Sequence, residues 1–224
     1  MPEPRTKKTP TRCRWCEGSD DYVAYHDLEW GRSVVDETRL FEKICLEGFQ
    51  SGLSWITVLR KREAFREAFV GFDAPKVARF SEAKVQKLLG NAGIIRHRGK
   101  IESTINNAKC LNEMHRGGGS LAELVWSFAD RAARTVPDAN GSLPSQTPAS
   151  TALSKELKRR GWSFVGPTTV YAFMQSMGVV NDHVAGCHVR TACERERKMI
   201  LATGVGVAPL ADTLRPTTRG GAAR

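Results

Sequence analysis

Apolar residues recur along this chain with the period of an α-helix, and this pattern constrains the fold more than any other feature. Ile101, Ile105, Ala108 and Leu111 follow the i, i+4, i+7 spacing that places side chains on one face of a helix. Runs of alternating polar and apolar residues, which indicate half-buried strands, are scarce. The sequence therefore predicts an all-α domain.

Capping residues and prolines divide the helical pattern into segments. The predicted helix starts are Asp36, Ser54, Ser81, Ser120 and Pro167. The segment that starts at Ser54 is expected to continue to Phe69, and the segment that starts at Pro167 is expected to end near Gly178. Residues 137–150 are rich in Pro and Ser and are expected to form a long internal loop.

The charge of the chain is concentrated at its two ends. The formal net charge is +10, and residues 1–14 and 188–224 each contribute +4 of it. Basic ends favour nucleic acid or another polyanion as a partner, or they only keep unstructured ends in solution. With 224 residues the chain can bury a core of its own, so the fold needs no disulfide or metal to compensate for small size.

The sequence points to a cytoplasmic, nucleoid-associated protein. No apolar stretch is long enough to span a membrane. Residues 1–12 contain no apolar segment of the kind found in secretory signals. In that compartment the six cysteines are expected to be thiols or metal ligands and not a disulfide framework.

Cysteine and histidine residues near both ends of the domain suggest a metal site. His183 and Cys187 are four residues apart, and Cys13 and His26 stand at the other end of the chain. Structural zinc sites use four Cys or His ligands, so these pairs together could join the first and last segments. The spacing leaves Cys16, His188 and Cys193 open as alternative ligands.

The energies permit such a clasp. Closing the 157-residue separation between His26 and His183 costs about 4.5 kcal/mol plus a constant. A structural zinc contributes about 10–16 kcal/mol of apparent binding free energy in small peptides. The alternatives are scattered thiols and surface imidazoles, or a redox pair in the CRWC sequence of residues 13–16, which lacks the βαβ context of such a motif.

Residues 88–101, LLGNAGIIRHRGKI, join two helical patterns through a short glycine-containing turn. The second helix is expected to begin near Arg98, so its free N–H groups could face an anion. The basic side chains beside this turn are Arg96, His97, Arg98 and Lys100. This pattern favours a hairpin that holds a DNA backbone, and the alternative is an ordinary turn with solvated charges.

One acidic residue lies at the edge of an apolar stripe. Glu47 follows Leu40 and Ile44 at i+7 and i+3. A carboxylate in that place is costly unless it is paired, although a boundary glutamate that reaches solvent is the alternative. The aromatic residues in the surrounding sequence are Trp15, Tyr22, Tyr25, Trp30 and Trp55, and such residues are usually part of a core.

Longer ordered blocks resemble the bacterial 3-methyladenine DNA glycosylase I family. They are AYHDLEWG, ICLEGFQSGLSWITVLRKRE, NAGIIRHRGKI, VWSF, TPASTALSKELKRRG and FVGPTTVYAFMQSMGVVNDHV. The resemblance covers residues 12–188 and implies a single helix–hairpin–helix DNA glycosylase domain, with its N- and C-terminal segments joined by a structural zinc ion. Residues 1–11 and 189–224 fall outside it as basic tails that we expect to be largely unstructured.

The resemblance also implies roles for particular residues. Glu47 is the expected catalytic residue, and Tyr25 and Trp55 are expected to line the base pocket with three further aromatic residues, Trp15, Tyr22 and Trp30. The implied zinc ligands are Cys13, His26, His183 and Cys187. The implied DNA contacts are Gly52, Leu53, Gly93, Arg96, His97, Arg98, Gly99 and Lys100. Phe49 departs from the smaller or polar residue typical of the family, which leaves the fine shape of the pocket open but not the reaction.

The implied activity is hydrolytic removal of 3-methyladenine from alkylated double-stranded DNA by a monomer that flips the base out of the duplex. No activated nucleophile is evident, so we expect a monofunctional enzyme, with Asp27, Glu29 and Asp182 as acids near enough to position water. A protein that binds alkylated DNA without cleaving it is the second hypothesis. A zinc hydrolase or deaminase is disfavoured because the corresponding motifs are absent.

Overall fold

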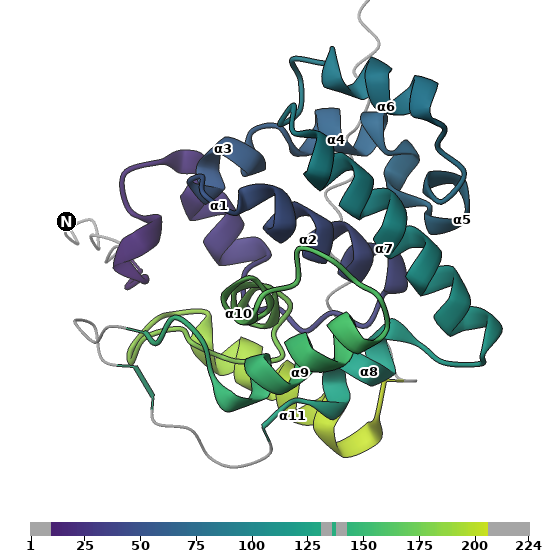
Figure 1. Ribbon diagram of the computed structural model, residues 1–224. Coiled ribbons are helices and arrows are strands. Elements are labelled where there is room, and N and C mark those ends of the chain that lie inside the picture. Colours follow the sequence, from purple (N-terminus) through teal and green to yellow (C-terminus); the bar gives the residue numbers. More distant parts are fainter. Residues whose placement is uncertain (1–9, 131–135, 138–142, 206–224) are drawn as a thin grey trace, which may run out of the picture.

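The computed structural model describes residues 10–130, 136–137 and 143–205, and the regular elements in these ranges are all helical (Figure 1). The predicted all-α fold is therefore confirmed. Two short 3-10 helices are η1 Arg14–Cys16 and η2 Val70–Phe72. The α-helices are α1 Asp20–Leu28, α2 Glu37–Gln50, α3 Trp55–Leu59, α4 Arg62–Ala68, α5 Ala74–Val77, α6 Glu82–Leu89, α7 Arg98–Arg116, α8 Leu121–Ser127, α9 Pro148–Arg159, α10 Pro167–Ser176 and α11 Arg190–Thr203.

Side-chain caps begin several of these helices where the sequence predicts them. Asp36, Ser81 and Ser120 each accept a hydrogen bond from the backbone N–H three residues further on. α7 begins at the predicted Arg98, and the Nδ1 atom of His97 accepts the hydrogen bond of the Lys100 N–H at 3.3 Å. These caps fix where α2, α6, α7 and α8 start.

Two segments differ from their predictions. The helix expected from Ser54 to Phe69 is divided into α3 and α4, with Val58 and Phe65 fully buried on either side of the break. α9 begins inside the predicted 137–150 loop, because Thr147 and Ser150 form a reciprocal capping box ahead of it. Residues 138–142 of that loop lie outside the described residues.

The core surrounds α2, which lies in the centre of the molecule and packs against both α7 and α10 (Figure 1). Phe49, near the end of α2, is buried against Phe65 and Phe69, with ring centroids 4.6 and 5.8 Å away. The departure from the family at Phe49 is therefore a feature of the core. Phe49 lies on the core-facing side of α2, and the large ring fills space between α2 and α4.

The C-terminal segment is structured further than expected. Residues Arg190–Thr203 form α11, whose Cys193 and Ile200 are buried. Arg197 is also buried, and its Nε donates to the Val179 carbonyl at 2.9 Å. The expectation that most of 189–224 is unstructured is incorrect for residues 190–203, because these apolar and hydrogen-bonded positions hold the helix to the domain. Residues 1–9 and 206–224 lie outside the described residues.

A close backbone contact brings the segment after α1 against the end of α10. Gly178 has a φ of +70°, and a Cβ atom there would lie 2.6 Å from the Ser33 backbone nitrogen. The N–H of Val34 donates to the Met177 carbonyl at 3.1 Å beside it. Only glycine fits this contact, which places residues 30–34 next to the segment that carries His183.

Candidate active site and metal centre

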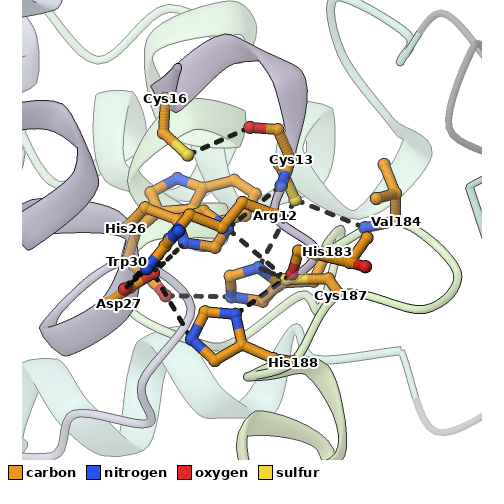
Figure 2. Close-up of polar contacts among 11 residues, drawn as sticks. Arg12, Cys13, Cys16, His26, Asp27, Trp30, His183, Val184, Cys187 and His188 are labelled. Carbon is orange, nitrogen blue, oxygen red and sulfur yellow. Dashed lines mark hydrogen bonds and ion pairs between the residues drawn. The ribbon is translucent and has the colours of Figure 1, made fainter. Parts of the chain in front are cut away.

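Four Cys and His side chains from the two ends of the described chain meet in a buried cluster (Figure 2). Their ligand atoms all lie within 4.8 Å of one another. The Nδ1 atom of His183 is 3.6 Å from Cys13 Sγ and 3.5 Å from Cys187 Sγ, and the Nε2 atom of His26 is 3.5 Å from Cys187 Sγ. The edges of a tetrahedral Cys/His metal site measure about 3.3–3.8 Å, and these three separations fall in that range.

The second ring nitrogen of each histidine is held by a partner outside the cluster. His183 Nε2 donates to the Trp30 carbonyl at 3.1 Å, and His26 Nδ1 is 2.8 Å from Asp27 Oδ1. These bonds turn the opposite ring nitrogens toward the sulfur atoms, an arrangement typical of metal-bound histidines. The four residues of the predicted ligand set are thus brought together as a site that could hold a metal ion.

Asp27 is part of this arrangement, where the sequence suggested an acid that positions water. Arg12 donates to both Asp27 oxygens at 2.8–3.0 Å (Figure 2). Burial alone would raise the pKa of Asp27, but the hydrogen bonds from Arg12 and His26 outweigh it and hold the pKa below its usual range. Asp27 is therefore an ionised carboxylate that orients His26.

The pKa values of the two cysteines in the cluster are shifted in opposite directions. Hydrogen bonding to Cys187 and burial raise the pKa of Cys13, whereas the hydrogen bond from Cys13 lowers the pKa of Cys187. A bound cation would remove this conflict, because both thiolates can then be ligands. The alternative ligands turn elsewhere: Cys16 Sγ donates to the Cys13 carbonyl at 3.0 Å, and His188 Nδ1 lies 3.1 Å from the Thr11 carbonyl oxygen.

Next to the cluster is a cavity of about 230 Å³. It is lined by Trp15, Tyr22, Tyr25, Trp30, Glu47, Gln50, Trp55, Leu143, Ala172 and Gln175. All five predicted aromatic residues and Glu47 are therefore on its wall. Trp15 packs edge-on against Tyr22 and Trp30, with ring centroids 5.6 and 5.1 Å away. Tyr25 and Trp55 are tilted by 42° at a centroid distance of 5.5 Å.

Glu47 is the buried acid of this cavity, with 4% of its surface exposed. Its Oε1 atom is 2.8 Å from the ammonium nitrogen of Lys43, one helical turn earlier on α2. Lys43 also donates to the Tyr25 hydroxyl at 2.8 Å. Burial, followed by the charge of Glu47, raises the pKa of Tyr25 well above its usual value, so the phenol stays protonated.

The sequence reasoning missed Lys43 and four residues that line the cavity. Lys43 precedes Glu47 by four residues, and this i, i+4 pairing was visible in the sequence. The four residues are Gln50, Leu143, Ala172 and Gln175, which carry no comparable signal.

The other two expected acids are occupied by protein partners. Glu29 is paired with Arg62 at 2.6 Å. Asp182 accepts hydrogen bonds from the Tyr171 hydroxyl at 2.6 Å and from Gln175 Nε2 at 2.9 Å. Asp182 thus supports Gln175, a residue of the cavity wall.

The loop between α2 and α3 projects beside the cavity. Gly52 has a φ of +82°, and the Leu53 side chain is 40% exposed although it is a large apolar group. The loop is held by the Leu53 N–H, which donates to the Gln50 carbonyl at 2.7 Å, and by the Gln50 side chain, which donates to the Leu53 carbonyl at 3.3 Å. This places an exposed apolar side chain at the tip of a turn with both ends fixed.

The predicted hairpin joins α6 to α7, but its basic side chains differ in their exposure and in their ion pairs. Arg96 and His97 are exposed. Arg98 is ion-paired with Glu82 and Glu102, both at 2.9 Å. Gly93 donates its N–H to a side-chain oxygen within the turn, and Gly99 lies in the first turn of α7.

Lys100 faces inward, contrary to its prediction as a DNA contact. Its side chain is buried, and Nζ donates to the Phe49 carbonyl at 2.8 Å and to the Ser51 carbonyl at 2.6 Å. These carbonyls belong to the end of α2, where the negative end of the helix dipole attracts a cation. Lys100 therefore fixes the loop that carries Leu53, because its ammonium group is bound to these two carbonyls.

Comparison with known proteins places these features in one family. The sequence model of the methyladenine glycosylase family matches residues 15–191. The DNA-3-methyladenine glycosylase of Haemophilus influenzae is 48% identical over 184 residues, which cover 81% of this chain and 99% of that protein. DNA-3-methyladenine glycosylase 1 of Escherichia coli is 51% identical over 177 residues, 79% of this chain and 95% of that protein.

Solved structures agree. A crystal structure of a 3-methyladenine DNA glycosylase I, 51% identical, superposes with a TM-score of 0.77 and covers 80% of this chain and 98% of its own. The Staphylococcus aureus protein, solved for the basis of 3-methyladenine recognition, is 31% identical with a TM-score of 0.75 over 80% of this chain and 96% of its own. Among the described residues, no helix is long and apolar enough to cross a membrane.

Proposed function

This chain belongs to the methyladenine glycosylase family and removes 3-methyladenine from DNA in base-excision repair, and we propose here the residues and the chemistry by which it does so. The observation that carries the proposal is a buried carboxylate, Glu47, in the wall of an otherwise aromatic cavity. A cavity of this size and lining suits one planar base. A base inside a duplex is out of reach, so the nucleotide must be flipped out to enter it.

The cavity selects the damaged base by its charge. Adenine that is methylated at N3 carries a positive charge in the nucleotide, whereas normal adenine is neutral. Stacking on Trp55 and Tyr25 contributes about 1–3 kcal/mol for any base. The cation gains an additional attraction to the ring faces and to the Glu47 carboxylate, and neutral adenine gains neither.

The reaction is hydrolytic and monofunctional. The positive charge of the methylated base weakens the N-glycosidic bond, so the base leaves with little need for protonation. A lysine that attacks the sugar needs a free amine, but the Lys43 nitrogen is held as an ammonium by Glu47 and Tyr25. Water therefore takes the sugar carbon. Borohydride should trap no covalent adduct between the protein and methylated DNA, and a trapped adduct would contradict this step.

The ion that we propose for the Cys/His cluster is Zn²⁺ in a structural role. Two thiolates and two imidazoles match the ligands and geometry that zinc prefers. Four protein ligands fill the tetrahedron and leave no position for substrate, so the ion would supply stability and not chemistry. It would join residues 13–26 to residues 183–187, and Trp30 would link it to the cavity, since the Trp30 ring lines the cavity while its carbonyl holds His183.

Double-stranded DNA would be held by the α6–α7 hairpin and by the α2–α3 loop. Arg96 and His97 are exposed beside the N-terminus of α7, where backbone N–H groups favour a phosphate. Leu53 is the side chain suited to fill the space that a flipped nucleotide leaves. One chain carries the cavity, the hairpin and the loop, so a monomer in the cytoplasm, where it reaches the nucleoid, suffices for the reaction.

Release of free base from methylated duplex DNA tests the proposal. The wild-type protein should release 3-methyladenine and leave unmodified adenine in place. Glu47→Gln should slow release roughly 10- to 100-fold, the loss expected for one charged interaction of about 1.5–3 kcal/mol. Because this change leaves Lys43 without its counterion, unfolding and metal content must be measured on the same sample. A folded protein that binds methylated DNA but releases nothing would instead be a damage sensor.

A further inference from the structure

The connection between α9 and α10 carries an aromatic side chain on the surface of the protein. Phe164 is 40% exposed, although phenylalanine is a residue type that is usually buried. Its backbone has a φ of +55°, a left-handed conformation that is strained for a bulky side chain. A single exposed apolar residue is common on protein surfaces, so the surroundings of Phe164 must decide what the ring is for.

Hydrogen bonds on both sides of Phe164 hold it in this conformation. The Ser163 N–H donates to Asn107 Oδ1 at 2.9 Å, and the Ser163 carbonyl accepts from Asn107 Nδ2 at 3.0 Å. The Val165 carbonyl accepts from the Ser154 hydroxyl at 2.6 Å. Contacts to α7 and α9 thus impose the strain at Phe164, and strained residues that are held by their surroundings occur most often at functional sites.

The side chain of Phe164 lies between α2 and the start of α7. A Cβ atom at Gly48 would be 3.3 Å from Phe164 Cβ, and a Cβ atom at Gly99 would be 3.8 Å from Phe164 Cζ. Gly48 belongs to the last turn of α2, which leads into the loop that carries Leu53, and Gly99 belongs to the first turn of α7. The ring therefore joins the two features assigned above to DNA, the α2–α3 loop and the α6–α7 hairpin.

His97 of the hairpin packs edge-on against the Phe164 ring. The two ring centroids are 6.3 Å apart and the planes are inclined at 76°. His97 Nδ1 accepts the Lys100 N–H, so a neutral imidazole has its proton on Nε2. Because His97 is exposed, this N–H can donate to a phosphate oxygen. An exposed aromatic ring thus adjoins a position suited to a phosphate.

We propose that the Phe164 ring packs against a deoxyribose of double-stranded DNA, next to the phosphate that the α6–α7 hairpin holds. A DNA backbone alternates anionic phosphates with sugar rings that present C–H groups, and a donor beside an exposed aromatic ring matches this alternation. This inference rests on the proposed function, which assigns the hairpin to DNA. The contact reads no base edge, so it should hold damaged and undamaged duplex equally.

The salt dependence of DNA binding separates this contact from a charged one. The logarithm of affinity falls linearly with the logarithm of salt concentration, with a slope set by the number of phosphates that the protein neutralises. Phe164→Gly removes the ring and leaves a residue that accepts the positive φ. It should bind a short undamaged duplex roughly three- to tenfold more weakly than wild type, with an unchanged slope. Phe164→Tyr keeps the ring and should bind like wild type.

Val70→Gly is the matched control. Val70 is also 40% exposed and has a positive φ of 48°, but it lies in η2, which packs against α2, α4 and α5. This variant should bind DNA like wild type. Thermal unfolding is measured on each sample, and if Phe164→Gly does not fold, Phe164→Asn replaces it, since asparagine also tolerates a positive φ.

An unchanged affinity in Phe164→Gly would overturn the proposal. A weaker affinity with a smaller salt slope would also overturn it, because Phe164 would then act by positioning His97 or Arg96 against a phosphate. An equal loss of affinity in Val70→Gly would show that the effect does not come from the place of the ring.

Base release measured in parallel separates this contact from the proposed function. If the wild-type protein neither binds methylated duplex nor releases 3-methyladenine, the proposed function fails and the sugar contact fails with it. If wild type releases the base and Phe164→Gly binds duplex equally well, only the sugar contact fails. Phe164 is not one of the residues that line the cavity, so Phe164→Gly should reach the wild-type rate of release at saturating DNA. A lower rate at saturation would contradict a role in binding alone.

Discussion

Gly31 packs directly against the imidazole ring of His183: a Cβ atom at Gly31 would lie 2.7 Å from His183 Nε2. The same nitrogen donates to the carbonyl of the preceding residue, Trp30, at 3.1 Å. The backbone at 30–31 therefore sets both the position and the tautomer of this ring. The geometry of the Cys/His cluster therefore depends on a glycine that is not one of its four residues.

Gly31→Ala should displace His183 and reduce metal binding. A methyl group would clash with the ring, and the φ of +79° would be strained for alanine, so we expect a loss of at least about 2 kcal/mol of unfolding free energy. Gly118→Ala is the matched control, because Gly118 has a φ of +76° with nothing within 4 Å of a Cβ atom. It should lose only about 1 kcal/mol and keep its metal. Equal metal content in the two variants, measured by atomic emission, would contradict the role of Gly31.

Cys187→Ser should remove the metal, whereas Cys16→Ser should retain one zinc ion per chain. Cys16 is also buried, but its sulfur donates to the Cys13 carbonyl and is not in the cluster. Structural zinc contributes on the order of 10 kcal/mol of apparent binding free energy in small peptides, so the metal-free variant should unfold at a clearly lower temperature. Thermal unfolding with and without a chelator measures this. Metal loss in Cys16→Ser and not in Cys187→Ser would reverse the ligand assignment.

Lys100 and Arg96, four residues apart, should have separable effects. Lys100→Met leaves two carbonyls at the end of α2 without their charged donor, so we expect a loss of about 2–4 kcal/mol of unfolding free energy. Arg96→Met should change stability by less than about 0.5 kcal/mol, but it should weaken DNA binding and reduce its salt dependence by about one phosphate contact. Unfolding and DNA titrations at several salt concentrations give both results. DNA affinity that is insensitive to Arg96→Met would remove this residue from the DNA surface.

Glu37 should make the stability depend on pH. Its carboxylate accepts hydrogen bonds from the Ala122 N–H at 2.8 Å and from the Ser120 hydroxyl at 2.7 Å, at the start of α8. Burial alone would raise the pKa of Glu37, but these bonds outweigh it and the pKa is lowered. A lowered pKa in the folded state contributes stability above the unfolded pKa of about 4.3, and this stability is lost as the pH falls through the folded value.

Glu37→Gln should therefore be less stable than wild type by about 1–2 kcal/mol at pH 7. The two proteins should approach each other in stability as the pH is lowered from about 5 through the acid range, because the wild-type carboxylate becomes protonated there. Urea unfolding at several pH values gives the comparison. A difference that stays constant down to the lowest pH would mean that the charge of Glu37 is unimportant.

Local patterns predict the helices well where capping and periodicity agree. α7 begins at Arg98 and buries Ile101, Ala108 and Leu111 as the spacing indicates. α11 was hidden because its basic composition resembles that of an unstructured tail, although Cys193 and Ile200 are seven residues apart and face the core. The prediction for this segment relied on its composition, but its short apolar pattern indicated the structure more accurately.

The environment of a charged residue could not be predicted in the same way. Lys100 stands among basic residues in the sequence, but its partners at Phe49 and Ser51 are separated from it by 51 and 49 residues. Lys43 and Glu47 are visible as a helical pair, yet only the packing of Tyr25 and Trp55 against them makes Glu47 part of a cavity wall. Such contacts depend on how helices pack, which local spacing does not specify.

The cluster of cysteines and histidines would also make metal capture a late event in biosynthesis. Cys13 and His183 are separated by 170 residues, and synthesis proceeds from the N-terminus. A nascent chain thus carries Cys13 and His26 as half of a site that nothing completes until Cys187 has left the ribosome. An ion held by all four residues would mark a polypeptide translated to that point, since a product that terminates earlier lacks two of the four ligands.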